Sequence, residues 1–240
     1  MAFSANTRVK EIAVANPGAK KVLEDAGVDY CCGGERPLHD ACMKAGVSAE
    51  EILRRLQENS KQVSAEEKNW TAAALCELTQ HIVAKHHGYV REQIPRLRAL
   101  LDNVKSKHGQ NHPELAEIEI CFLDLGQEMY GHMQKEEQIL FPYIERLERA
   151  TLEKRKPEPP FFGTVRNPIQ MMMQEHDSAG QLLQEMRKLS GGYQLPAEAC
   201  ESYWELYRSL EEFEADMHAH VHLENNILFP RAAEMEAAAN

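Results

Sequence analysis

The chain has 240 residues, which is enough for one large core or for a helical bundle with a small appended module. Its 27 lysines and arginines face 38 aspartates and glutamates, and the formal net charge of -11 argues against nucleic acid and anionic membranes as partners. The first residues lack the apolar core of an export signal, so we expect a cytoplasmic protein whose six cysteines are reduced.

The segment 1–60 is predicted to form a small helical domain. Short helix-period stretches alternate with turn residues such as Asn16-Pro17-Gly18, and Ser48 is placed to cap the helix that follows it. The adjacent Cys31 and Cys32 cannot easily form an ordinary disulfide, because neighbouring residues violate the usual Cα separation. Two free thiols next to Gly33-Gly34 would be able to coordinate iron, accept nitrosyl groups or exchange with the thiols of a partner, and the residues alone leave this role open.

The segment 70–240 is predicted to form an antiparallel four-helix bundle, so the fold class is all-α. A polar stretch, 58–69, is interpreted as a linker into it. Two short loops and one long crossover, 153–167, join the helices, as in antiparallel bundles. Proline predicts a break or kink near Pro95 and near Pro142. We expect helices over about 70–101, 113–151, 167–190 and 196–234.

The second and fourth helices carry the same motif. HMQKEEQILFP begins at His132 and HVHLENNILFP begins at His220, an offset of 88 residues. Each copy places a histidine four residues before a glutamate, Glu136 or Glu224, so that both side chains share one helical face with apolar neighbours. A buried carboxylate without a partner costs on the order of several kcal/mol, so the repeated pair predicts a bound cation.

The first and third helices supply two further histidines in the same phase. His87 and His176 are 89 residues apart, and each lies on an apolar stripe, which His86 fits less well. Mixed nitrogen and oxygen donors suit iron or manganese rather than calcium or magnesium. Two metals fit better than one, with both glutamates bridging them and positions left for an oxo group, oxygen or nitric oxide. The alternative, core histidines and surface glutamates without a metal, is disfavoured because the whole pattern repeats.

These motifs resemble known families. The His-x-x-x-Glu pairs with ILFP, the step Glu175-His176-Asp177 and the turn Val90-Arg91-Glu92-Gln93 resemble hemerythrin-like domains. Asn16-Pro17 together with Asp29-Tyr30-Cys31-Cys32-Gly33-Gly34 resembles the ScdA-type N-terminal domain, and the fusion resembles the RIC (repair of iron centres) di-iron family. The resemblance implies two non-haem irons, carboxylate-bridged by Glu136 and Glu224 and oxo-bridged when oxidised. It also implies that Glu128 and Glu175 line an iron path.

The resemblance also implies a function. Family members help to restore iron-sulfur clusters damaged by nitrosative or oxidative stress, with iron donation as the expected means and damaged iron-sulfur proteins or the cluster assembly machinery as partners. Two alternatives stay open: nitric oxide binding or reduction at the di-iron centre, which would make the protein an enzyme, and a non-catalytic gas sensor. The sequence also leaves the oligomeric state open, a homodimer included.

Overall fold

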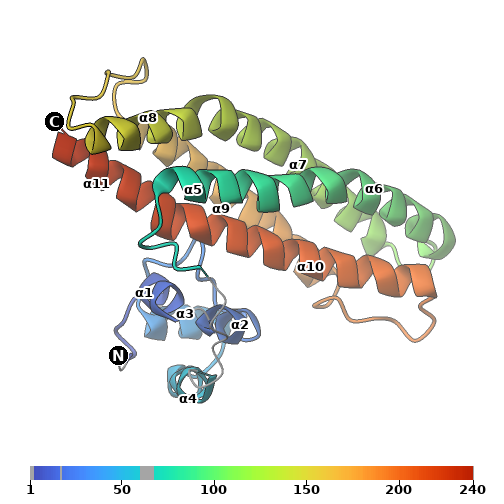
Figure 1. The fold of residues 1–240 in the computed structure, drawn as a ribbon. Coiled ribbons are helices and arrows are strands. Elements are labelled where there is room, and N and C mark those ends of the chain that lie inside the picture. The colour runs from blue at the N-terminus through green and yellow to red at the C-terminus, as the bar shows by residue number, and fades with distance from the viewer. Residues whose placement is uncertain (1–2, 17, 60–67, 240) are drawn as a thin grey trace.

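The computed structural model describes residues 3–16, 18–59 and 68–239 (Figure 1). Across these residues the regular structure is helical, and the only β pairing is an isolated bridge between Arg8 and Pro37. The predicted all-α fold is confirmed. Within the same residues, no helix has the length and apolar character needed to cross a bilayer.

The N-terminal part consists of four short helices, α1 (Val9–Ala15), α2 (Ala19–Glu24), α3 (Leu38–Ala45) and α4 (Ala49–Asn59). They enclose a core of their own that includes Ile12, Leu23 and Leu56. Ser48 Oγ accepts a hydrogen bond from the backbone N–H of Glu51 at 3.4 Å, which confirms the predicted helix cap. Residues 60–67, which form the centre of the predicted linker, lie outside the described residues, and so does Pro17.

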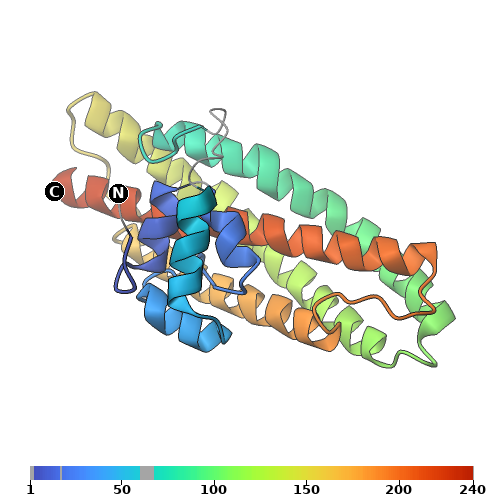
Figure 2. The same ribbon diagram turned by 90° about the horizontal axis from the view of Figure 1, so that it is seen from below.

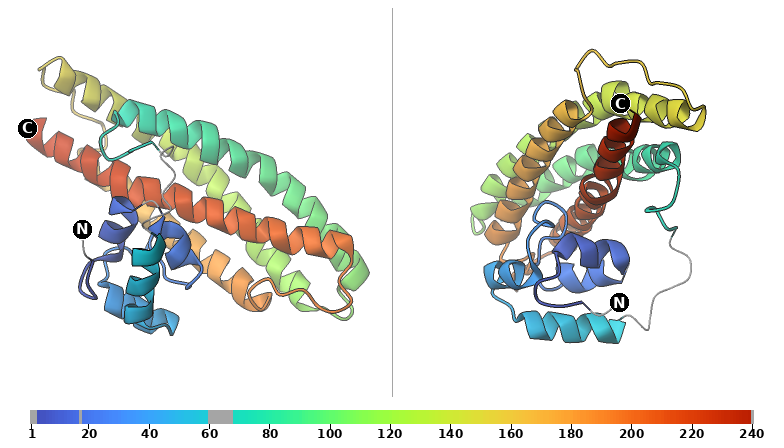
Figure 3. Two further views of the ribbon diagram at one scale, coloured as in Figure 1. Left: turned by 60° about the horizontal axis from the view of Figure 1, so that its bottom comes forward. Right: turned by 90° about the vertical axis from the view of Figure 1, so that its left-hand side faces the viewer.

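The remaining chain folds into four antiparallel segments (Figures 1 and 3). Three of them contain a π-helical turn, labelled η, between two α-helices. The second segment packs along the third, and the first packs along the second and the fourth. The segments are α5 (Leu75–His81), η1 (Ile82–His87) and α6 (Gly88–His108); α7 (Glu114–Lys135), η2 (Glu136–Leu140) and α8 (Phe141–Leu152); α9 (Arg166–Leu189); and α10 (Glu201–Leu223), η3 (Glu224–Leu228) and α11 (Phe229–Ala239).

Proline explains two of the three π-helical turns. Pro142 and Pro230 stand at equivalent places of the repeat, at the second residue of the helices that follow η2 and η3. Proline lacks an N–H and its ring clashes with the carbonyl four residues earlier, and a wider preceding turn relieves both problems. At Pro95 the helix α6 is not broken but continues through the proline, and a kink there stays a prediction. Buried side chains before and after Pro95, among them Ile94 and Leu97, pack into one core and hold the helix together.

Several helix ends differ from the expected ones. The first segment starts at Leu75 and runs to His108 instead of Leu101, because Val104 extends its buried stripe by another turn. The fourth starts at Glu201 instead of Pro196. The third ends at Ser190-Gly191-Gly192 as predicted, where both glycines adopt positive φ and the Gly192 N–H bonds the Arg187 carbonyl at 2.7 Å, a geometry that favours glycine.

Buried carboxylates anchor the end of the bundle that contains α5 and α11. Glu148 accepts hydrogen bonds from the backbone N–H groups of Leu75 at 2.6 Å and Cys76 at 2.9 Å, and so caps the start of α5 from a different helix. Glu236 on α11 accepts from the Tyr143 hydroxyl at 2.7 Å and the Val165 N–H at 2.9 Å. These bonds tie the long crossover and the helix ends together.

Two apolar clusters fill the bundle, one towards each end. One includes Leu97, Phe122 and Phe213, and the other includes Leu78, Ile144 and Phe229. The N-terminal helices lie against one side of the bundle, beside the junction of α10 and α11 (Figure 2). A polar cluster occupies the middle of the bundle, between the two apolar ones.

Candidate metal centre

All six predicted ligands meet in the middle of the bundle. The three π-helical turns contribute to it directly, since His87 ends η1, Glu136 begins η2 and Glu224 begins η3. Every one of the six side chains is at most 1 % exposed. The structure thus brings together, from all four segments, His87, His132, Glu136, His176, His220 and Glu224.

The four histidines form two pairs. His87 Nε2 lies 3.1 Å from His220 Nε2, and His176 Nε2 lies 3.0 Å from His132 Nε2. In each pair the ring nitrogens that face each other come from different segments of the bundle. Two imidazole nitrogens that converge in this way can ligate one cation between them with small side-chain shifts.

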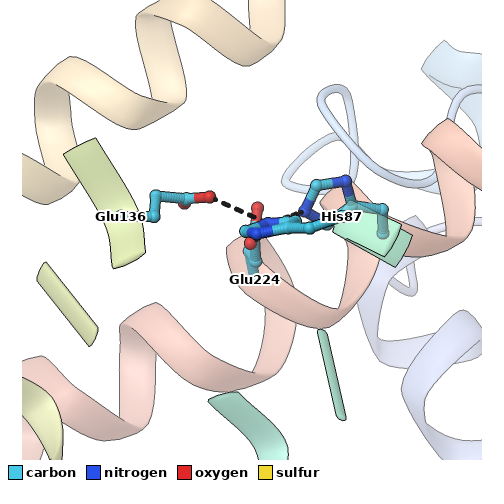
Figure 4. Close-up of side chains that lie close together, drawn as sticks. His87, Glu136 and Glu224 are labelled. Carbon is cyan, nitrogen blue, oxygen red and sulfur yellow. Dashed lines mark hydrogen bonds and ion pairs between the residues drawn. The ribbon is translucent and has the colours of Figure 1, made fainter. Parts of the chain in front are cut away.

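Both glutamates are shared between the two histidine pairs. Glu136 Oε2 lies 3.3 Å from Nε2 of His87 and also 3.3 Å from Nε2 of His132. The two oxygens of Glu224 lie 3.0 Å from Nε2 of His220 and 3.0 Å from Nε2 of His176. Figure 4 shows Glu136 reaching from its own segment toward His87 and Glu224. The arrangement therefore offers two adjacent positions, each with two nitrogen and two carboxylate donors.

The buried negative charge of the two glutamates has to be balanced by a cation or by protons. Both oxygens of Glu136 and Oε2 of Glu224 are buried and form no hydrogen bond among the described residues. Burial lowers the pKa of His132, but the charge of Glu136 and the hydrogen bond to Glu175 outweigh this effect and raise the pKa to about 10. Without a metal, protonated histidines must balance the carboxylates, whereas metal ions would balance both at once. The donor set fits iron, with nitrogen and carboxylate ligands and no thiolate.

The outward-facing Nδ1 atoms of three predicted ligand histidines have partners that fix their rings. Because Nε2 faces the centre, Nδ1 carries the proton and donates it. His87 Nδ1 donates to Glu137 at 2.6 Å, His132 Nδ1 to Glu175 at 2.9 Å, and His176 Nδ1 to Asn225 Oδ1 at 2.9 Å. His220 Nδ1 is buried and has no hydrogen-bond partner among the described residues.

His86, which the sequence ranks below His87, is also buried, and it stands against the ring of His220. The two rings stack with centroids 5.5 Å apart and an angle of 6° between their planes. His86 Nδ1 lies 2.9 Å from Asp216 Oδ1. His86 thus supports the position of His220 from outside the ligand set.

The repeated ILFP sequence has a structural role at the centre. Phe141 stacks on His87 with centroids 5.8 Å apart, and Phe229 stacks on His176 with centroids 6.1 Å apart. Each phenylalanine comes from one copy of the motif and supports a histidine of another segment. Stacking against a buried ring fixes the imidazole plane and adds apolar contact beside the polar cluster.

The predicted iron-path residues lie outside the ligand cluster. Glu175 accepts from His132 and from Lys135, and its side chain is 30 % exposed. Burial acts to raise the pKa of Glu175, but these two hydrogen bonds outweigh it and lower the pKa to about 2. Glu128 is exposed and accepts from the Ser178 hydroxyl at 2.9 Å. Glu175 therefore lies between His132 and solvent, and Glu128 is exposed one helical turn before His132 on α7.

The cysteine pair lies beside the centre. Cys32 Sγ is 3.6 Å from the backbone oxygen of His176, and Asn225 Nδ2 donates to the backbone oxygen of Cys31 at 3.3 Å. Both thiols are free. The hydrogen bond to Cys32 and burial raise the pKa of Cys31 well above its ordinary value.

Sequence reasoning missed Glu137 and Asn225, although a signal for them was present. Each follows a predicted ligand glutamate directly, and the two are 88 residues apart, at the same place in the repeat. Both are polar residues at equivalent positions of the repeat, a carboxylate in one copy and an amide in the other. In the structure they are the hydrogen-bond partners of His87 and His176.

Comparisons with known proteins cover both parts of the chain. Residues 78–232 match the hemerythrin HHE cation binding domain, and residues 5–60 match the ScdA_N domain, a domain of unknown function (DUF542). The chain is 35% identical over 232 residues to a probable iron-sulfur cluster repair protein of Haemophilus influenzae, which covers 95% of this chain and 96% of the relative. It is 36% identical over 231 residues to the iron-sulfur cluster repair protein YtfE of Musicola paradisiaca, again with 95% and 96% covered.

A relative from Escherichia coli O8, also named iron-sulfur cluster repair protein YtfE, is 32% identical over 222 residues, or 92% of this chain and 94% of the relative. The two family matches together, and each of these relatives by itself, cover nearly the whole chain and not the bundle alone. The chain therefore belongs to the repair of iron centres family, in which a ScdA-type N-terminal domain precedes a hemerythrin-like domain.

Proposed function

We propose that this protein repairs iron-sulfur clusters damaged by nitrosative or oxidative stress, and that it does so by supplying iron from a di-iron centre. The observation that carries the proposal is the sharing of Glu136 and Glu224 between two histidine pairs, which provides two adjacent cation positions. The names of the relatives support the same function. Damaged iron-sulfur proteins or the cluster assembly machinery are the proposed partners, and the cytoplasm the proposed compartment.

In this proposal each side chain has a defined task. Four histidines bind through Nε2, while Glu136 and Glu224 bridge the two positions as carboxylates. Glu137, Glu175 and Asn225 hold three of the rings in orientation. Bound iron supplies the transferable metal and the redox chemistry.

The two parts of the chain divide the work. We propose two domains, an N-terminal domain at 1–60 and the bundle at 70–240. The bundle stores the metal, and the N-terminal domain presents the thiols of Cys31 and Cys32 beside it. Support comes from the contact between Cys32 and the backbone of His176. Glu128 and Glu175 are proposed to line an iron path, since Glu175 contacts His132 and is partly exposed, and Glu128 is exposed one turn earlier on the same helix as His132.

A repair assay tests the proposal. An iron-sulfur enzyme inactivated by nitric oxide is incubated anaerobically with the iron-loaded protein, with an equal concentration of free ferrous iron, or with the Glu136→Ala, Glu224→Ala double variant. We expect recovery of the enzyme well above that with free iron for the wild type and no gain for the variant. Equal recovery with free ferrous iron would contradict iron donation.

Nitric oxide chemistry is a second candidate function. Each cation position has four protein donors, which leaves room for a small exogenous ligand such as nitric oxide or oxygen. Anaerobic incubation with excess nitric oxide and an electron donor distinguishes the two functions. Many turnovers to nitrous oxide would make the protein an enzyme, whereas binding of nitric oxide in proportion to the iron alone would reject catalysis.

A further inference from the structure

A second group of metal-ligating side chains lies outside the di-iron centre. It is formed by Asp29, Cys31 and Cys32, whose ligand atoms all lie within 4.8 Å of one another. The two sulfurs are 3.8 Å apart, and Cys31 Sγ is 3.4 Å from Asp29 Oδ1. The three side chains thus converge although none of them belongs to the histidine and glutamate cluster.

The local backbone holds these donors in place. Asp29 Oδ1 accepts from the N–H groups of Cys31 at 3.1 Å and Cys32 at 3.0 Å, and its Oδ2 accepts from the Gly33 N–H at 2.9 Å. A Cβ on Gly33 would lie 2.8 Å from Asp29 Oδ2, and a Cβ on Gly34 would lie 2.8 Å from the Tyr30 backbone oxygen. A side chain at Gly34 would therefore force the backbone apart and one at Gly33 would displace the carboxylate, which three backbone N–H groups hold in place before any ligand arrives.

The chemistry of the group differs from that of the di-iron centre. Thiolates prefer soft or borderline cations such as zinc, cuprous and ferrous ions, whereas oxygen donors alone favour hard cations such as magnesium and calcium. Closed structural metal sites use four protein donors, and sites with three keep a position open for an incoming ligand. Two sulfurs and one carboxylate match an open site for a thiophilic cation.

The position of the loop connects it to one half of the di-iron centre. Asn225 accepts from His176 Nδ1 through Oδ1 and donates to the Cys31 backbone oxygen through Nδ2. A Cβ on Gly180, one turn after His176, would lie 3.7 Å from Cys32 Sγ, so this sulfur packs directly on α9. Burial decreases across the group, from the buried Cys31 through the half-buried Cys32 to the exposed Asp29. The group therefore has one side toward His176 and one side toward solvent.

We propose that Asp29, Cys31 and Cys32 form a third metal site, which binds one thiophilic divalent cation beside the His132/His176 pair. The inference rests on the proposed function, in which the cation is ferrous iron on its way to a client and the open coordination position receives a thiolate of that client. On binding, each thiol loses its proton to solvent and forms one sulfur–metal bond, and no electron is transferred.

Cobalt(II) is the probe for this site. The full-length protein is first loaded with iron, so that the histidine cluster is occupied, and is then titrated anaerobically with cobalt while the thiolate-to-metal absorption is recorded. We expect one further equivalent to bind, with two sulfur neighbours by X-ray absorption at the cobalt edge. Cys31→Ser and Cys32→Ser should each weaken binding at least tenfold and Asp29→Asn about tenfold, while Cys121→Ser, a half-buried cysteine on α7, leaves it unchanged.

Three outcomes would overturn the proposal: no cobalt bound beyond the iron-loaded centre, thiolate absorption that persists in both cysteine variants, or cobalt without sulfur neighbours. Unchanged iron content and circular dichroism in the variants show that any loss is local and not a failure to fold. No client is present in the titration. A negative result here therefore leaves repair by the di-iron centre intact, and a failed repair assay leaves the binding of cobalt unaffected.

Discussion

Individual side chains make the two halves of the proposed di-iron centre unequal. His132 donates to a carboxylate and His176 to an amide, while His87 donates to Glu137, which also accepts from Arg91 at 2.7 Å. The fourth ring, His220, is held by stacking. Each cation position therefore has one imidazole that is backed by a carboxylate, and the positions differ in the second imidazole: His176 has an amide partner, whereas His220 Nδ1 has no hydrogen-bond partner among the described residues.

The shared and unshared ligands predict different losses of iron. Glu136 contributes to both positions, so Glu136→Ala should leave well under one iron per chain. His220 contributes to one position, so His220→Ala should leave about one. Elemental analysis of the purified variants checks both, with the exposed Asp124→Ala as a control that keeps two. Two irons retained by the Glu136 variant would remove this residue from the ligand set.

Variants of two neighbouring asparagines distinguish direct support of the metal from docking of the cysteine loop. Asn225→Ala removes the acceptor of His176 Nδ1 and should weaken iron binding at the His132/His176 position by about 10 to 100-fold. Asn226→Ala should weaken iron binding by a smaller factor, because Asn226 contacts Tyr30 and His222 but no predicted ligand histidine and so acts only through docking of the loop. Competition with a chelator measures both affinities. Equal affinities would show that Asn225 does not support the metal.

At the level of the helices, the π-helical turns decide which residues reach the centre. In an α-helix successive residues point about 100° apart, so the neighbour of a buried glutamate faces away from the core. The turns η2 and η3 begin at the ligand glutamates and change that phase. Glu137 and Asn225 can then contact histidines of other segments.

This phase change sets the limit of what the sequence predicts. The six cluster residues could be found because the His-x-x-x-Glu spacing repeats in two helices and His87 and His176 follow the same offset. Their role as ligands remains a prediction. The partners Glu137 and Asn225 could not be placed by α-helical phase, and the cap of α5 by Glu148 depends on packing between segments that the sequence does not encode locally.

The anchor at Glu236 predicts a pH-dependent stability. Burial acts to raise the pKa of Glu236, but hydrogen bonds from Thr164, Tyr143 and the Val165 N–H outweigh it and keep the pKa below its ordinary value. A depressed carboxyl pKa stabilises the fold at pH values above the unfolded-state pKa, and this contribution disappears as the pH falls through the folded-state pKa.

Glu236→Gln should therefore lower the free energy of unfolding by about 2 kcal/mol near neutral pH, and the difference from the wild type should shrink below about pH 4.5. Urea unfolding at a series of pH values measures this. Glu234→Gln, an exposed residue on the same helix, is the control and should change little. A difference that grows in acid would contradict the assigned role of the carboxylate.

At the scale of the whole molecule, a small polar contact fixes the N-terminal domain on the bundle. Asn226 Nδ2 donates to the Tyr30 backbone oxygen at 2.9 Å and to His222 Nδ1 at 2.9 Å. Tyr30 also packs edge-on against His222, with ring centroids 5.4 Å apart. Burial and the charge of Lys20 lower the pKa of His222 to about 3, so its Nδ1 stays free to accept.

Removing this contact should loosen the docking without unfolding either part. In Asn226→Ala, hydrogen–deuterium exchange of residues 29–34 should increase about tenfold, while exchange in the bundle core stays unchanged. Asn111→Ala, in the exposed loop between α6 and α7, serves as the control. Unaltered exchange at residues 29–34 would mean that other contacts fix the loop.

The double role of Asn225 has a thermodynamic consequence. The same amide bonds the ring of His176 and the backbone of Cys31, so the state of the metal centre and the position of the loop share one element. Linkage is reciprocal: any free energy by which metal binding strengthens docking of the loop equals the free energy by which docking strengthens metal binding. A client that draws the cysteine loop away from the bundle would, by the same factor, loosen the hold of His176 on its iron and so favour release only when a recipient is present.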